Sequence, residues 1–184
     1  MKILAFGASN SQNSINKKLA SFTATLIPNA EVEVLDLSKF ELPIFSEDLE
    51  KEIGQPKAAI EFFKRISSSD GIIISFAEHN GTYTAAYKNL FDWTSRIDQL
   101  VFQNRPVIYL ATSPGPGGAG SVLKSAKESA KFFGADLKAS VSIPSFYDVF
   151  DVKTGCITES NALAELHSAI HPFIKHQTLE HEAS

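Results

Sequence analysis

The sequence predicts a doubly wound α/β fold, in which five parallel strands in the order 2-1-3-4-5 form a sheet with helices on both faces. Two observations carry this prediction. Short apolar runs alternate along the chain with longer segments whose apolar residues recur every three or four positions. Polar loops rich in glycine or serine follow the first, third and fourth apolar runs, and the ligand crevice of such a sheet lies where those strands end.

The five apolar runs are expected to be the strands. Residues 31–34 alternate between polar and apolar side chains, which is typical of a half-buried edge strand. Residues 72–76 follow an Asp-Gly turn and are apolar toward both faces, which a central parallel strand needs. The strands are therefore predicted at residues 2–6, 31–37, 72–76, 106–111 and 137–143.

Five further segments have helical periodicity. In the first, Ile15, Leu19, Phe22 and Leu26 recur at i, i+4, i+7 and i+11, and Ser14 stands in the N-cap position. Pro172 is expected to kink or end the last helix. The predicted helices cover residues 15–26, 56–66, 86–97, 121–133 and about 159–171. The segments expected to be irregular are residues 38–55, 78–85 and 144–158.

Composition limits the class of protein. The 184 residues carry 17 basic and 21 acidic side chains, a net charge of −4, and we expect one domain over residues 1–175 with a polar tail at 176–184. A single cysteine cannot form an intramolecular disulfide, which favours a reducing, cytoplasmic location. The chain shows no secretory signal, no apolar stretch long enough for a bilayer and no basic face. Nucleic-acid and membrane partners are therefore not expected.

The loop after the first strand is a candidate phosphate site. It carries Ser9, Ser11, Ser14 and Asn16 and leads into a helix N-terminus, where free backbone N–H groups and the helix dipole attract anions. It lacks the Gly-Lys-Ser/Thr of a nucleoside-triphosphate loop, and its single glycine does not make a dinucleotide fingerprint. A capped helix beside a solvated loop is the alternative interpretation of the same residues.

Other motifs carry less weight. Residues 115–120 fit G-x-G-x-x-G, but they follow the fourth strand and no acidic residue ends the next one, so a dinucleotide site is not favoured. His167 and His171 lie i, i+4 on a helix with no third ligand nearby, so no metal site is expected. No nucleophile elbow is present, and nothing marks Cys156 as activated. No catalytic side chain is therefore predicted.

Two segments resemble a known family. Residues 75–82 (SFAEHNGT) and 88–96 (KNLFDWTSR) are similar to the P-E-Y-N-x-S and L-K-N-A-I-D-W-x-S-R patterns of the NADPH-dependent FMN reductases, which belong to the flavodoxin-like superfamily. The first loop resembles their G-S-x-R-x-x-S-x-N pattern. Ser11 stands in place of its phosphate-binding arginine, and Ala77 and His79 replace the proline and tyrosine of the second pattern.

The resemblance implies a flavodoxin-like FMN-binding domain. Backbone groups of residues 78–81 and 113–118 are expected to hold the flavin ring, and the first loop its phosphate. The implied cofactor-binding residues are Ser9, Ser11, Ser14, Ile15, Asn16, Glu78, His79, Asn80, Gly81, Ser113, Pro114, Gly115, Gly117 and Gly118.

The function that follows is an FMN-dependent oxidoreductase. It would take electrons from NADPH or NADH and pass them through FMN to a small acceptor such as a quinone, an azo compound, a metal oxyanion or a flavin. A flavodoxin-like one-electron carrier and a non-catalytic FMN-binding module are the alternatives. A homodimer or homotetramer is expected, because relatives pair through helices flanking the flavin and Leu90, Phe91 and Trp93 make one helix apolar on more than one side.

Overall fold

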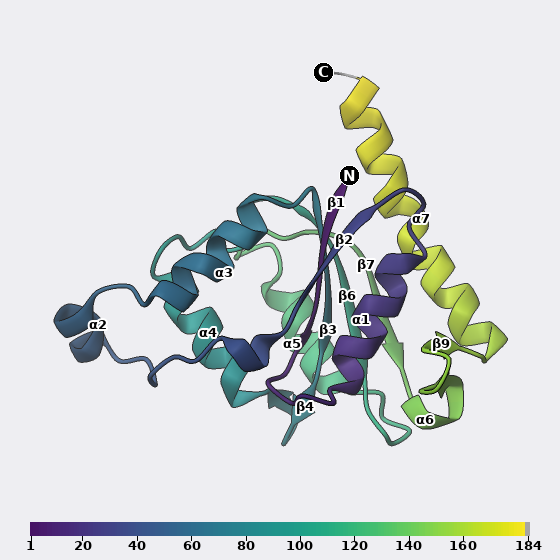
Figure 1. The fold of residues 1–184 in the computed structure, drawn as a ribbon, viewed down its shortest axis with the longest axis horizontal. Coiled ribbons are helices and arrows are strands. Elements are labelled where there is room, and N and C mark those ends of the chain that lie inside the picture. The colour runs from purple at the N-terminus through teal and green to yellow at the C-terminus, as the bar shows by residue number, and fades with distance from the viewer. Residues whose placement is uncertain (183–184) are drawn as a thin grey trace.

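A five-stranded parallel sheet forms the centre of the protein (Figure 1). The computed structural model describes residues 1–182; the last two residues of the expected tail lie outside this range. The sheet order is β2-β1-β3-β6-β7, which is 2-1-3-4-5 when the long strands alone are numbered. The predicted order, parallel pairing and edge position of the second strand are thus confirmed. The strands are β1 (Lys2–Ala8), β2 (Glu31–Leu35), β3 (Gly71–Phe76), β6 (Pro106–Thr112) and β7 (Asp136–Ile143).

Helices cover both faces of the sheet, as expected. One face packs on α3 (Lys57–Ser67), α4 (Ala85–Ser95) and α5 (Gly120–Ser129), and the other on α1 (Ile15–Thr25) and α7 (Ser160–Glu182). Alternate residues of each strand feed two separate cores; Leu4 of β1 joins the first and Ile3 the second. The side chains of β3 and β6 are buried along their whole lengths, which explains their unbroken apolar runs.

The segments expected to be irregular contain short elements. A 3-10 turn, η1 (Leu37–Lys39), precedes α2 (Glu47–Ile53), which projects from the body in Figure 1. No residue of α2 is buried, so its sequence has no apolar periodicity; its start is fixed by Ser46, whose Oγ accepts the Leu49 N–H at 3.1 Å. The remaining elements are β4 (Glu78–His79), β5 (Thr82–Tyr83), α6 (Phe146–Val149), β8 (Phe150–Asp151) and β9 (Cys156–Ile157).

The last helix departs from the prediction at Pro172. We expected the helix to finish near residue 171, but α7 continues through Pro172 to Glu182. Proline removes one backbone hydrogen bond, and the burial of the neighbouring Ile170 and Phe173 against the sheet compensates for it. Tertiary packing thus overrides the local signal. Across residues 1–182, none of the helices has the length and apolar character needed to cross a membrane.

Candidate functional site

The loops after β1, β3 and β6 enclose one pocket of about 260 Å³ at the carboxyl ends of these strands. Nine of the fourteen expected cofactor-binding residues line it, although they come from three distant parts of the sequence. They are Ser9, Ser11, Ser14, Ile15, Asn16, Glu78, His79, Ser113 and Pro114. The pocket also contains four residues that sequence reasoning did not select: Asn13, Ala77, Thr112 and Tyr147.

The first loop presents the N-terminus of α1 to the pocket. The Oγ of Ser14 accepts the N–H of Lys17 at 3.1 Å and so caps the helix. The N–H groups of Ile15 and Asn16, in the same first turn, have no acceptor within the helix and remain available to an anion. The close approach of β1 to α1 requires Gly7, because a Cβ there would lie 2.4 Å from the Lys17 nitrogen.

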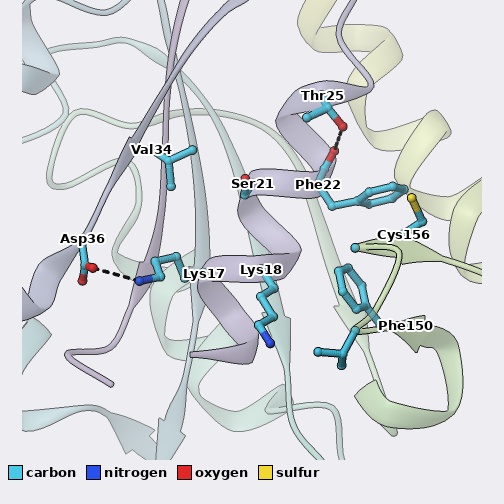
Figure 2. A pocket seen from close by; sticks show the side chains of 11 residues that line it. Lys17, Lys18, Ser21, Phe22, Thr25, Val34, Asp36, Phe150 and Cys156 are labelled. Atoms are coloured by element: carbon cyan, nitrogen blue, oxygen red, sulfur yellow. Dashed lines mark hydrogen bonds and ion pairs between the residues drawn. The ribbon is translucent and has the colours of Figure 1, made fainter. Parts of the chain in front are cut away.

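Among the residues whose side chains the structure describes, neither a lysine nor an arginine lines this pocket. The nearest lysine in sequence, Lys17, turns to the outer side of α1 and forms a 3.0 Å ion pair with Asp36, as Figure 2 shows. Hydrogen bonds from Ser38 and Lys17 lower the pKa of Asp36 to about 2, so this pair is ionised at neutral pH. Ser11, in the place of the family arginine, is exposed and brings no charge.

Asn16 holds the first and third loops together. Its Nδ2 donates to the carbonyl of Thr112 at 3.1 Å, and its Oδ1 accepts from the Thr112 N–H at 3.1 Å and from the Ser75 hydroxyl at 2.7 Å. The residue is 2% exposed, and these internal bonds use both lone pairs of Oδ1 and one of the two Nδ2 protons. We expected Asn16 among the cofactor-binding residues; it lines the pocket, and its side chain positions the strand ends.

The second loop is a tight hairpin formed by β4 and β5. Asn80 and Gly81 form its turn with φ angles of 53° and 80°, the type I′ geometry that an Asn-Gly pair favours. The pocket lining includes Glu78 and His79 but neither turn residue. We expected residues 78–85 to be irregular, although the Asn-Gly pair within them is a sequence signal for a hairpin.

Glu78 connects the second loop to the third. Its Oε2 accepts the N–H of Val122 at 2.9 Å, in the first turn of α5. The N-cap residue of that helix is Ala119, which has no side-chain acceptor, so a carboxylate from another loop serves as the cap. Glu78 is the sole carboxylate in the lining of the pocket, and this bond engages it.

The third loop is shaped by its glycines. Ser113 and Pro114 line the pocket, whereas Gly115, Gly117 and Gly118 do not. A Cβ on Gly115 or Gly117 would meet open space, so a flat ligand can approach this backbone closely. At Gly118 the fold itself requires glycine, since its φ is +57° and a Cβ would lie 2.3 Å from the Ser142 Oγ.

Tyr147 of α6 reaches the same pocket from beyond β7. Its side chain is 62% exposed, while the preceding Phe146 is fully buried and anchors the short helix. The sequence did not point to Tyr147, because the loop after the fifth strand is not one of the three at the crevice of this fold. The titratable side chains lining the pocket are Glu78, His79 and Tyr147.

A larger cavity, of about 650 Å³, lies on the outer face of α1 between β2 and the β8–β9 hairpin (Figure 2). Its walls include Phe22, Val34 and Phe150, with the Lys17–Asp36 ion pair at one side. None of the fourteen expected residues lines it. It also lies away from the strand ends at which ligands bind in this fold, so the smaller pocket is the candidate site.

The segment of residues 88–96 has a scaffold role. Asn89 accepts the N–H of Phe45 at 2.9 Å and donates to the carbonyl of Pro43 at 3.0 Å, to which Trp93 also donates through Nε1 at 2.8 Å. Leu90 and Trp93 are 2% and 0% exposed within the chain itself. Asn89 and Trp93 therefore hold the segment before α2 against α4. The burial of Leu90 and Trp93 within the chain gives no support to the expectation that they contribute to a subunit interface.

A family model described as NADPH-dependent FMN reductase matches residues 1–148. The chain belongs to this family. Its members are oxidoreductases that use a reduced nicotinamide and FMN, so the expected family, enzyme class and cofactors are confirmed at this level. The segments at residues 75–82 and 88–96, which carry the sequence resemblance, both lie within the matched range.

Individual relatives agree with the family assignment. An NAD(P)H-dependent FMN reductase of Pseudomonas aeruginosa is 26% identical over 156 residues, which are 83% of this chain and 83% of that protein. A quinone reductase of Escherichia coli is 27% identical over 121 residues, or 65% and 64% of the two chains. FerB of Paracoccus denitrificans, a flavoenzyme NAD(P)H:(acceptor) oxidoreductase, shares the fold with a TM-score of 0.78 and 22% identity over 95% of each chain.

Proposed function

We propose that this protein binds FMN in the pocket formed by the loops after β1, β3 and β6. In this proposal it passes electrons from NADPH or NADH to a small acceptor: a quinone, an azo compound, a metal oxyanion or a free flavin. The observation that carries the proposal is the convergence of nine expected residues from three distant loops on one pocket at the crevice of the sheet.

The groups in the pocket fit FMN. The N–H groups of Ile15 and Asn16, with the hydroxyls of Ser9 and Ser11, suit a phosphate at the N-terminus of α1. The open space beside the third-loop glycines suits a flat ring. Bound there, FMN would supply the hydride and electron transfer between the nicotinamide and the acceptor. The protein's contribution is to orient the ring, exclude water from one face and direct backbone dipoles at the charge that the ring gains.

The scarcity of carboxylates favours an oxidoreductase over a one-electron carrier. Carriers of this fold are typically acidic around the flavin, which makes full reduction unfavourable. Here Glu78 is the single carboxylate lining the pocket, and its charge is partly offset by the N-terminus of α5. The environment should therefore tolerate the negative charge of the reduced ring.

Two experiments test the proposal. Isothermal titration of the protein with FMN should give binding near one-to-one at micromolar concentration; no binding at that concentration would refute the site. Anaerobic titration of the FMN-loaded protein with NADPH, and separately with NADH, should then bleach the flavin absorbance. Reduction by dithionite but by neither nicotinamide would favour the electron carrier, and bound FMN that no reductant bleaches would favour the binding module.

We also propose that the protein acts as a homodimer or homotetramer in the cytoplasm. Exposed apolar side chains on the α4–α5 side support an interface there, since Leu100 is 42% and Phe132 is 62% exposed. The single cysteine supports a reducing compartment. Light scattering should give a mass of at least two chains of 20.1 kDa at micromolar concentration, whereas a monomeric mass would refute the assembly.

A further inference from the structure

A third cavity, of about 240 Å³, lies between α4 and α5 against the face of β3 and β6. It shares no lining residue with the pocket proposed for FMN. Its walls are mainly aromatic and include the rings of Phe76, Phe91, Phe102 and Phe133. Several of these rings meet edge to face, such as Phe91 and Phe133 at 4.7 Å between centroids.

Two tyrosine hydroxyls in this cavity have no partner. Tyr87 and Tyr109 line the cavity and are 3% and 1% exposed, yet neither hydroxyl forms a hydrogen bond within residues 1–175, whose side chains the structure describes. The fully enclosed unpartnered side-chain atoms in that range belong to Gln55 and Arg105. Both phenol oxygens must therefore reach free space, and the cavity is the space that these two residues line.

Both phenols are hydrogen-bond donors at any physiological pH. Burial raises the pKa of Tyr87 and of Tyr109 well above the ordinary value, so each keeps its proton. Within residues 1–175 neither phenol is hydrogen-bonded to the neighbouring hydroxyls of Tyr83 and Ser129, and the Ser129 hydroxyl itself donates to the backbone carbonyl of Ser125 at 3.2 Å. A buried donor without an acceptor is costly, so the cavity lacks an acceptor atom that an occupant can supply.

We propose that the cavity binds a small neutral aromatic molecule whose carbonyl oxygen accepts hydrogen bonds from Tyr87 and Tyr109. Aromatic walls favour a ring that can pack edge to face against them. The volume supports a substituted benzene, since a cavity of about 150 Å³ already admits benzene itself.

The charges at the cavity favour a neutral ligand over an anion. The one lysine in the lining, Lys88, is exposed at the cavity mouth and holds both carboxylate oxygens of Asp92, at 2.7 and 2.8 Å. No unpaired cation therefore faces the interior. An anion would lose its hydration among phenylalanine rings without a compensating charge, whereas a carbonyl needs only the two phenol donors.

Acetophenone, a benzene ring with a carbonyl group, is a suitable probe. The proposal does not depend on FMN binding. We expect protein-observed NMR of the full chain to show one-to-one binding, with a Kd on the order of 0.1–1 mM for a ligand of this size. The amide shifts should lie in α4, α5 and β6. The Kd should be the same with FMN present, because the two cavities share no residue.

Matched variants test the hydrogen bonds. Tyr87→Phe and Tyr109→Phe each remove one hydroxyl and keep the ring, so each should weaken acetophenone binding by about threefold to tenfold. Tyr147→Phe, in the other pocket, makes the same chemical change and should leave the Kd unaltered. The proposal is overturned if acetophenone does not bind, which would mean a cavity filled by water alone. It is equally overturned if both tyrosine variants bind like the original chain, or if FMN displaces the probe.

Discussion

Replacing Asn16 with alanine should destabilise the fold far more than its position in a polar loop suggests. The Asn16 amide joins the start of α1 to β3 and β6 through three hydrogen bonds. The substitution removes all three and leaves the N–H and carbonyl of Thr112 and the hydroxyl of Ser75 without partners. Thr112 and Ser75 are 1% and 0% exposed, so water reaches these groups only through the gap that the missing amide leaves.

The size of the effect follows from the number of bonds. A satisfied hydrogen bond contributes about 1 kcal/mol net, and a buried polar group left unpaired costs about 1–3 kcal/mol. Three lost bonds, with some rescue by water, give a loss of about 3–5 kcal/mol in the free energy of unfolding. With a urea slope of about 2 kcal/mol per molar for a chain of this size, the unfolding midpoint should fall by about 1.5–2.5 M.

Urea unfolding followed by the fluorescence of Trp93 measures this loss directly, because Trp93 is the one tryptophan of the chain and is fully buried. Asn13→Ala is the matched control, since Asn13 is exposed and lines the same pocket. This substitution should change the free energy of unfolding by less than about 0.5 kcal/mol. If Asn16→Ala shifts the midpoint no further than the control does, the amide does not hold the strand ends together and the reasoning fails.

Two further predictions concern charge near α1. Ser11→Arg should tighten FMN binding by about tenfold or more in isothermal titration, because a charge-assisted hydrogen bond to phosphate contributes about 1.5–3 kcal/mol; unchanged affinity would mean that the new side chain does not reach the phosphate. The pKa of Asp36 is lowered to about 2 from 3.8 by hydrogen bonds from Ser38 and Lys17, so its stabilisation is fully present above about pH 4 and is lost as the pH falls toward 2. Asp36→Asn should therefore lower the free energy of urea unfolding at pH 7 by about 1 kcal/mol, and the difference between the two chains should shrink steadily as the pH falls from about 4 toward 2; a constant difference across this range would contradict the assignment.

The long elements were predictable because a buried face requires apolar residues at the period of the helix or strand. The strand at residues 72–76 is apolar on both faces since both faces are covered, and the edge position of residues 31–35 showed in their alternation. The elements that sequence analysis missed bury little. The helix α2 has no buried residue, so only the cap at Ser46 marks it. The extension of α7 beyond Pro172 depends on contacts with the sheet that local sequence does not encode.

The sequence predicted which loops form the candidate site, because the order of the strands determines that. It did not predict which way the side chains of those loops point. The order of the strands placed three loops at one edge, and nine of the expected residues line the pocket there. Sequence patterns could not show that the Asn16 side chain turns inward, or that Glu78 reaches across to cap α5. Sequence patterns did not predict Tyr147, because it lies after β7, outside the three crevice loops, on a short helix whose Phe146 is buried.

The positions that match the family pattern and those that depart from it have different structural roles. Asn16 and Glu78 match, and each joins one loop to another through buried or half-buried hydrogen bonds that exist without any ligand. Ser11 and His79 depart from the pattern, and both side chains are exposed at the pocket with no part in those bonds. The pattern therefore specifies the arrangement of the loops more strongly than the contacts that a ligand makes. Because a rigid pocket can be kept while its exposed side chains change, we expect the acceptor preference of this chain to depend on His79 and Tyr147 rather than on the shared motif.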